Sequence, residues 1–198
     1  MRKFKWIIAL VVFVDVAWGD IWIGNANLTG PVPRPKSYQE AVKFFNLDKL
    51  NFDNFQSGSM LNHMNLGKMI MYASPGYAGL TVRHNTAAGA EPASWPGALE
   101  VDEAISGPTD LKITMNQPVQ SIGFVMMGLD VRGYLKIYGD GDVLLGDYSI
   151  SSALPGERRW IGVVNSDWDI WKVHFEPIAA DCYAIDDLEL GVVTPEPA

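Results

Sequence analysis

The stretch Cys182-Tyr-Ala-Ile-Asp-Asp-Leu-Glu-Leu190, near the C-terminus, decides the fold class. Apolar and polar side chains alternate along it, which is typical of a β-strand with one buried and one solvated face. Strict alternation places Asp186 on the same face as Leu188 and Leu190, so its carboxylate would turn toward the core. It places Asp187 on the opposite face. The last strand is therefore expected to carry a buried carboxylate, which is energetically costly unless it has a partner.

The same period of two continues upstream of this strand. It is clear in six further runs, at residues 80–82, 99–101, 111–115, 122–126, 135–137 and 171–175. Turn signals separate the runs, and Asp140-Gly141 is typical of a hairpin because both residues tolerate a positive φ. About ten short strands at this spacing predict an all-β fold, an antiparallel β-sandwich of jelly-roll type with one short N-terminal helix.

The N-terminal segment 1–19 has the pattern of a secretory signal peptide. Three basic residues within the first five precede the apolar run 6–14, and Ala17-Trp18-Gly19 places small residues at the positions that signal peptidase recognises. The apolar run is shorter than the roughly 20 residues that a membrane-spanning helix needs. The sequence therefore predicts export.

Composition limits the classes of partner. The chain has 15 basic and 23 acidic residues, and removal of 1–19 takes away three basic residues and one acidic residue, which leaves a formal charge of −10. This balance argues against nucleic acid as a partner, because phosphate binding needs a basic face. Cys182 is the single cysteine, so no disulfide can form within the chain.

The segment before the strands predicts a lead-in and a helix. Residues 20–36 are rich in Asn, Gly and Pro, which favours an extended conformation. Ser37 and Glu40 have the spacing of a capping box, and Tyr38, Ala41, Val42 and Phe45 follow at helical spacing, so we expect one short helix over 38–47. The expected organisation is a signal peptide at 1–19, a Pro-rich lead-in with the helix at 20–49, the β-sandwich at 50–191, and a linker with a terminal motif at 192–198.

Asp53, Asp186 and Asp187 are candidate metal ligands. The first and last strands of a jelly roll are commonly neighbours, which would bring Asp53 close to the closing strand. A buried carboxylate must be paired, hydrogen-bonded or bound to a metal, and calcium accepts several such oxygens. Two interpretations stay open: a structural calcium ion, or aspartates that accept main-chain amides at strand ends.

Trp95 and Trp168 are candidate ligand-binding residues. Trp95 lies in the longest predicted loop, over 85–97, and Asp167 and Asp169 flank Trp168. An exposed aromatic face beside polar groups suits a sugar, because the ring packs on apolar C–H groups while carboxylates bond the hydroxyls. The alternative is that the tryptophans fill the core or cover a sheet edge.

Catalytic motifs are missing from the sequence. There is no G-x-S-x-G elbow, no H-E-x-x-H pair and no phosphate-binding glycine loop. His63, His84 and His174 are far apart in the sequence, and His174, between two apolar residues, is expected to face solvent. We therefore expect that the protein is not an enzyme and has no catalytic residues.

The terminal Thr194-Pro-Glu-Pro-Ala198 resembles the start of the PEP-CTERM sorting signal of exported Gram-negative bacterial proteins. In that family the motif precedes a membrane-spanning helix and a basic cluster, and an exosortase processes it. Neither part follows here, so either the chain was cut at the motif or the protein is released. Segments at 50–55, 117–124, 160–164 and 183–188 look like strands of the β-sandwich often found before such signals. Ile185-Asp-Asp-Leu188 is also similar to the last strand of MAM-type jelly rolls, where an acidic residue can bind calcium.

The resemblance implies a secreted or outer-surface protein of a Gram-negative bacterium, associated with exopolysaccharide, biofilm or envelope matrix. Its partners would be extracellular polysaccharide or other matrix proteins, and it would meet a membrane only through the missing C-terminal anchor. We therefore predict a non-enzymatic cell-surface or matrix protein whose sandwich binds carbohydrate. The alternatives are a structural subunit that assembles through sheet edges or its N-terminal arm, and a polysaccharide-active hydrolase.

Overall fold

The computed structural model describes residues 20–26, 34–43, 45–74, 79–84, 97–101, 107–153, 157–165 and 170–193. These residues form twelve strands, one α-helix and one 3-10 turn. The predicted signal peptide 1–19 and the terminal motif 194–198 lie outside the described residues. No helix among the described residues is long and apolar enough to cross a bilayer.

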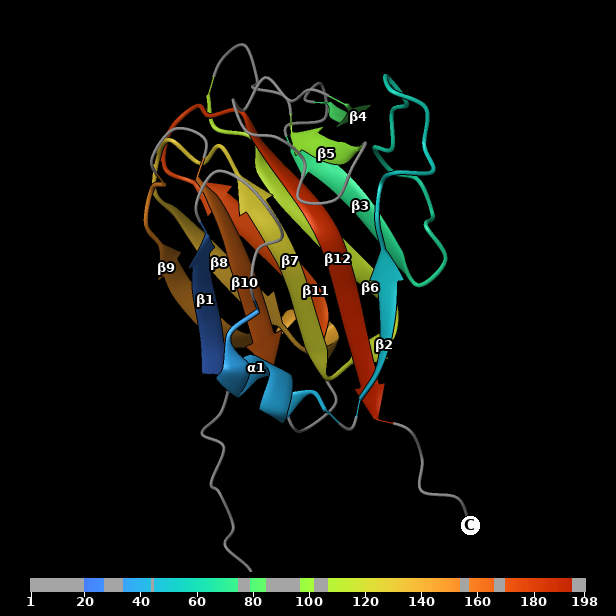
Figure 1. The fold of residues 1–198 in the computed structure, drawn as a ribbon, viewed down its shortest axis with the longest axis vertical. Coiled ribbons are helices and arrows are strands. Elements are labelled where there is room, and N and C mark those ends of the chain that lie inside the picture. Colours follow the sequence, from blue (N-terminus) through green and yellow to red (C-terminus); the bar gives the residue numbers. More distant parts are fainter. Residues whose placement is uncertain are drawn as a thin grey trace, which may run out of the picture.

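Two antiparallel sheets pack face to face (Figure 1). One sheet has seven strands in the order β1-β10-β7-β12-β5-β4, with β2 paired to β12; their bounds are β1 Asp20–Ala26, β10 Arg158–Val164, β7 Ser121–Met127, β12 Tyr183–Val193, β5 Ala98–Val101, β4 Leu80–Arg83 and β2 Phe45–Leu50. The other has five strands in the order β3-β6-β11-β8-β9, which span Met69–Ser74, Asp110–Val119, Ile170–Pro177, Gly133–Tyr138 and Leu144–Ile150. The predicted antiparallel sandwich of jelly-roll type with one short helix is confirmed.

Period-two patterning builds the core between the sheets. Along β3 and the first half of β6, buried residues alternate with half-buried ones, because one face of the five-stranded sheet meets the other sheet. All seven residues of β7 and all seven of β10 are buried, so both faces of these strands are covered. The five-stranded sheet therefore keeps an outer face that the described core does not cover.

β12 does not alternate strictly, because it contains a bulge. Asp187 has a φ of +49°, and the pairing of β12 with β7 shifts register between Asp186 and Glu189. The extra residue keeps core side chains inward on both sides of the bulge; these are Tyr183, Ile185, Leu188 and Leu190. Asp186 pairs with Val125, whose side chain packs in a second cluster on the outer side of the sheet. The prediction that Asp186 turns toward the inter-sheet core is therefore wrong.

The sandwich begins earlier than predicted. β1 pairs with β10 over all seven of its residues, and β2 pairs with β12 from Phe45 to Leu50. The expected lead-in at 20–49 thus supplies two strands of the seven-stranded sheet, and the boundary at residue 50 is wrong. The expected proximity of the first residues of the sandwich to the closing strand is confirmed by the pairing of Leu50 with Leu188.

The helix α1 is shorter than predicted and spans Lys36–Ala41. Pro35 is its N-cap and no side chain caps it, so Ser37 and Glu40 do not form a capping box. Phe45 belongs to β2 rather than to the helix, because ladder pairing with β12 competes for the same residues.

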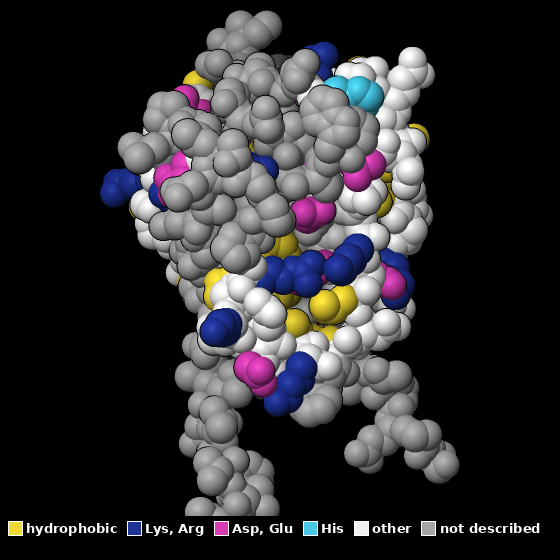
Figure 2. Space-filling model, viewed as in Figure 1, with side chains coloured by type: hydrophobic (Ala, Val, Ile, Leu, Met, Phe, Trp, Pro, Cys, Tyr) yellow, Lys and Arg dark blue, Asp and Glu magenta, His cyan; other side chains and the backbone are white. Residues whose placement is uncertain are grey.

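α1 packs on the outer face of the seven-stranded sheet. Tyr38 is buried and meets Trp160 edge to face, with 5.6 Å between ring centroids. The cluster beneath the helix consists of Tyr38, Val42, Ala98, Val125, Met127, Trp160, Val164 and Ala184. Figure 2 views this face and shows a band of basic side chains across its middle, beside hydrophobic ones. Residues 34–43, which we call the N-terminal arm, therefore pack on the outer face of the seven-stranded sheet.

Candidate ligand-binding face

The outer face of the five-stranded sheet is the candidate functional surface. Each of its strands sends alternate side chains away from the core. On β6, β8 and β11 these are aromatic or polar, and β3 contributes Tyr72 beside the apolar Ile70; the central aromatic and polar ones are Tyr72, Lys112, Thr114, Lys172, His174, Glu176, Tyr134, Lys136 and Tyr138. The one α-helix among the described residues, α1, packs on β10 of the other sheet. The face combines ring surfaces with hydrogen-bonding groups, which is what a polar ligand with apolar patches requires.

A cleft of about 410 Å³ lies on this face. Tyr72 from β3, Thr114 from β6, Trp171 and Lys172 from β11, and the turn Gly139–Asp142 line it. Two aromatic rings and several polar groups therefore meet at one opening. The volume falls within the range of small-molecule sites.

A bulge on β11 determines where Trp171 lies. The pairing of β11 with β6 shifts register between Ile170 and Lys172. Ile170 is buried in the core together with Val173 and Phe175, whereas Trp171 is only half-buried and lines the cleft. The expected alternation that placed Trp171 on the face of Val173 is therefore wrong, and the ring is left available to a ligand.

The turn at the end of the cleft joins β8 to β9. Its 3-10 segment Asp140–Asp142 has Gly141 at a φ of +61° and Asp142 at +63°, so the hairpin predicted at Gly141 is confirmed. The Asp142 carboxylate accepts a hydrogen bond from Lys172 Nζ. Lys172 Nζ also lies 4.9 Å from the centroid of the Tyr138 ring. These contacts fix Lys172 on the cleft wall.

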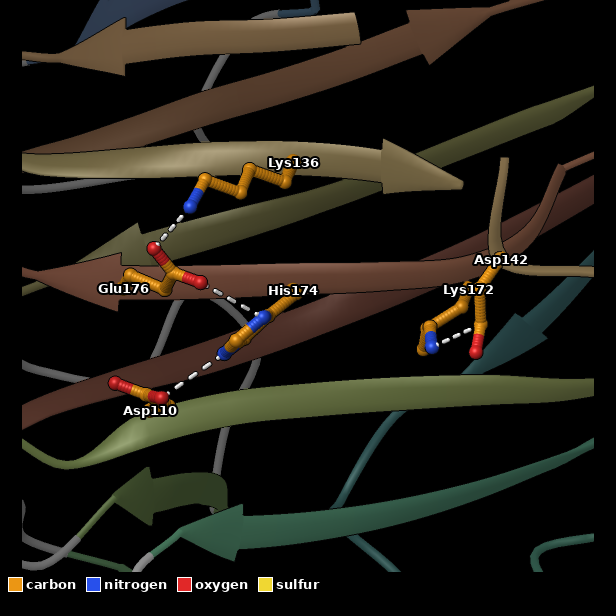
Figure 3. Close-up of polar contacts among 6 residues, drawn as sticks. All are labelled: Asp110, Lys136, Asp142, Lys172, His174 and Glu176. Carbon is orange, nitrogen blue, oxygen red and sulfur yellow. Dashed lines mark hydrogen bonds and ion pairs between the residues drawn. The ribbon is translucent and has the colours of Figure 1, made fainter. Parts of the chain in front are cut away.

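His174 lies between two carboxylates on the same face (Figure 3). Its Nε2 is 3.0 Å from Asp110 Oδ2 and its Nδ1 is 3.0 Å from Glu176 Oε1. Both ring nitrogens thus lie within hydrogen-bond distance of a carboxylate oxygen. Lys136 donates to the other Glu176 oxygen, and this hydrogen bond is the main cause that raises the pKa of Lys136. The histidine faces outward as predicted, but it belongs to an ion-pair network rather than to bulk solvent.

The Tyr72 ring is held from two directions. His63 stacks on it, with 5.3 Å between centroids and 7° between planes. His63 itself has a φ of +60°, in the left-handed region. Lys112 Nζ lies 5.9 Å from the Tyr72 centroid. Tyr72 is therefore an oriented ring at the cleft wall and not a freely rotating surface tyrosine.

Two of the three predicted metal ligands accept hydrogen bonds from main-chain amides. Asp53 Oδ1 accepts the amide of Gly97 at 3.1 Å, and Asp186 Oδ1 accepts the amide of Asp187 at 2.8 Å. The described residues contain no group of three or more His, Cys, Asp or Glu side chains that could hold a metal ion. The geometry thus matches the main-chain-amide interpretation for two of the three aspartates, and calcium binding stays a prediction.

The predicted ligand-binding tryptophans, Trp95 and Trp168, both lie outside the described residues. Trp160 is buried, as expected for most of the tryptophans. Sequence reasoning missed Tyr72 and Thr114, because nothing local marks them and only strand pairing brings them to Trp171. Trp171 itself carried a signal, since it lies three residues after Trp168.

Comparisons with known proteins concern the fold. No family model matches the chain, and no curated protein matches it in sequence. A variant of the family 29 carbohydrate-binding module CBM29-2, solved with mannohexaose, matches with a TM-score of 0.51 and 12% identity, over 74% of this chain and 92% of that chain. Another family 29 module has a TM-score of 0.47 and 13% identity, over 74% and 89%. A CBM29-2 variant solved with cellulohexaose has a TM-score of 0.45 and 14% identity, over 73% and 91%. At these identities the first match shows a shared β-sandwich fold.

Proposed function

We propose that this protein binds polysaccharide through the outer face of its five-stranded sheet, with Trp171 and Tyr72 as the ring contacts. The observation that carries this proposal is the cleft, which brings the two rings together with Thr114, Lys172 and the Asp140–Asp142 turn. Catalysis forms no part of the proposal.

The chemistry of the cleft suits a sugar. A pyranose ring has apolar C–H faces that pack on aromatic surfaces and hydroxyls at its rim that need donors and acceptors. Thr114 supplies a hydroxyl, Lys172 an ammonium group, and Asp142 a carboxylate that Lys172 already orients. The proposal also draws support from fold, because a family 29 module with this kind of sandwich was solved with mannohexaose.

The proposed setting is outside the cell. The signal pattern at 1–19 and the resemblance of 194–198 to the start of a PEP-CTERM signal support an exported surface or matrix protein of a Gram-negative bacterium. Mass spectrometry of the protein recovered from a Gram-negative host would test export directly. We expect the mature chain to begin at Asp20, and a chain retained in the cytoplasm with Met1 intact would contradict this.

Binding is tested by calorimetry against mannohexaose and cellohexaose. We expect Trp171→Ala and Tyr72→Ala to weaken binding at least about tenfold, because each removes a ring from the cleft. Met60→Ala is the control: Met60 is 67% exposed and forms a bridge with Thr81 of β4, in the other sheet, so it lies away from the proposed binding face. Melting curves must show that all three variants fold. No binding of the wild-type chain to any neutral or acidic oligosaccharide would refute the proposal.

The structural-subunit alternative has one specific observation in its favour. At the start of the edge strand β9, the side chains of Val143 and Leu144 are 60% and 52% exposed. An edge with exposed apolar side chains can pair with a second copy. Light scattering tests this: a dimer or larger assembly that Leu144→Lys converts to monomer would favour assembly, and a wild-type monomer at high concentration would dismiss it.

A further inference from the structure

Lys112 is set apart from the other basic side chains on the proposed binding face. Strands β6, β8 and β11 present four of these there: Lys112, Lys136, Lys172 and His174. Three of them contact carboxylates, since Lys136 pairs with Glu176, Lys172 pairs with Asp142, and His174 lies between two carboxylates. Among the described residues, the Lys112 ammonium group contacts only the Tyr72 ring.

The position of Lys112 is central to the face. It is the register partner of Tyr72 on β3 and of His174 on β11. It also lies two residues before Thr114 on β6, and Tyr72 and Thr114 both line the cleft. A ligand that packs on Tyr72 therefore brings its substituents close to the Lys112 ammonium group, which pairs with no carboxylate among the described residues.

The carboxylates near Lys112 have other partners. Asp110 and Glu176 contact His174, and Glu176 also pairs with Lys136. Figure 3 shows this network of Asp110, His174, Glu176 and Lys136. The Asp140 and Asp142 carboxylates belong to the turn after β8, at the other wall of the cleft. The acidic side chains of the cleft thus come from the turn, whereas Lys112 lies next to the Tyr72 ring, outside the lining of the cleft.

We infer that the polysaccharide is acidic, and that Lys112 receives an anionic group, a carboxylate or a sulfate, carried by the sugar that packs on Tyr72. This inference rests on the proposed function. The overall charge of the chain opposes a polyanion at long range, but at physiological ionic strength charges more than about 8 Å apart are largely screened. A local cation therefore decides which sugar is preferred.

The test compares oligosaccharides that differ in charge on one backbone: mannohexaose, the corresponding hexamannuronate, the methyl ester of that hexamannuronate, and a sulfated mannohexaose. We expect the full mature chain to bind hexamannuronate about fivefold more tightly than mannohexaose, and methyl esterification of the carboxyl groups to abolish the difference. If the sulfated ligand gains as much as the uronate, the site selects charge; if only the uronate gains, it selects carboxylate.

Substitutions of Lys112 test whether this residue causes the preference for anionic ligands. Lys112→Gln should remove the preference for the anionic ligands, measured as the ratio of the affinities for hexamannuronate and mannohexaose, and Lys112→Arg should keep that ratio. Lys49→Gln is the matched control, because Lys49 is an exposed lysine on the other sheet. Equal affinity of the wild-type chain for hexamannuronate and mannohexaose would overturn the inference while leaving the proposed function intact. Failure to bind any of these ligands would count against the proposed function itself.

Discussion

Arg34 and Glu189 form an ion pair, with 2.7 Å between Nη2 and Oε2, that fastens the N-terminal arm onto the seven-stranded sheet. The Glu189 side chain is 0% exposed, whereas that of Arg34 is 30% exposed and lies 5.1 Å from the centroid of the Trp160 ring. Burial raises the pKa of Glu189, and the charge of Arg34 acts in the opposite direction. The arm thus carries the cation that a buried carboxylate on β12 requires.

Arg34→Met should lower the free energy of unfolding by about 2–3 kcal/mol. Loss of a buried pair typically costs about 3–5 kcal/mol because a charge is left without its partner, and the partial exposure of Arg34 reduces this. Methionine keeps the apolar contact with Trp160, so the change reports mainly on charge. Urea denaturation measures the effect. Lys36→Met, at an exposed position on α1, is the control, and an equal effect of both substitutions would contradict the assignment.

The cost of Arg34→Met should depend on pH. The pKa of Glu189 is raised above its usual 4.5 in the folded state, so its contribution to stability is fully present below about pH 4.5 and is lost as pH rises through the folded pKa. A neutral Glu189 needs no cation. We therefore expect the destabilisation by Arg34→Met to be smaller at pH 4 than at pH 7.

Glu189→Gln supplies the matched comparison for this pH dependence. The variant stays neutral throughout, so the stability of the wild type relative to Glu189→Gln should fall between pH 4 and pH 7. Asp181, whose pKa burial also raises, is present in both proteins and cancels. A constant difference across this range would show that Glu189 does not titrate in the folded state with a raised pKa.

Gly162→Ala should lower the free energy of unfolding, because it disturbs the packing of the N-terminal arm on the sheet. A Cβ at Gly162 would lie 2.6 Å from Tyr38 ring carbons, and Gly162 is the register partner of Gly123, which also lies beneath Tyr38 and Trp160. Overpacking of this kind costs about 1–3 kcal/mol. The cost should fall in a Tyr38→Ala background, because the ring that clashes is gone. Equal costs in both backgrounds, measured by urea denaturation, would show that Tyr38 is not the residue that clashes.

A calcium titration tests the remaining metal prediction. An ion held by Asp53, Asp186 and Asp187 would stabilise the folded state and raise the melting temperature. Because Asp53 and Asp186 already accept main-chain amides, we expect the same melting temperature in calcium and in chelator. Asp53→Ala should still destabilise by about 1 kcal/mol through loss of the Gly97 contact. If calcium raised the melting temperature and Asp53→Ala abolished this rise, the result would support the metal site.

The fold was predictable from sequence because a sheet with one dry and one wet face imposes a period of two on its residues. The helix was predicted too long because residues 45–50 gain a ladder with β12, whose paired residues are 138 to 148 positions away in sequence, and no local pattern reveals this pairing. The cleft was missed for a similar reason. Tyr72, Thr114 and Trp171 come from three strands, and a bulge beside Ile170 gives Trp171 its direction. A bulge inserts one residue and shifts the alternation of inward and outward side chains, and the local sequence does not mark where this happens.

The bulge in β12 provides the most direct test of this last point. Asp187 adopts a φ of +49°, a region that costs an L-residue roughly 1–2 kcal/mol and a β-branched residue more. Asp187→Gly should therefore be neutral or slightly stabilising, Asp187→Asn should be tolerated, and Asp187→Val should destabilise by about 2 kcal/mol. Asparagine is the control for charge, because it removes the carboxylate while keeping the tolerance for this backbone. Urea denaturation ranks the three. If valine were tolerated as well as asparagine, the chain would not need the bulge at this position, and the inward placement of both Ile185 and Leu188 would require another explanation.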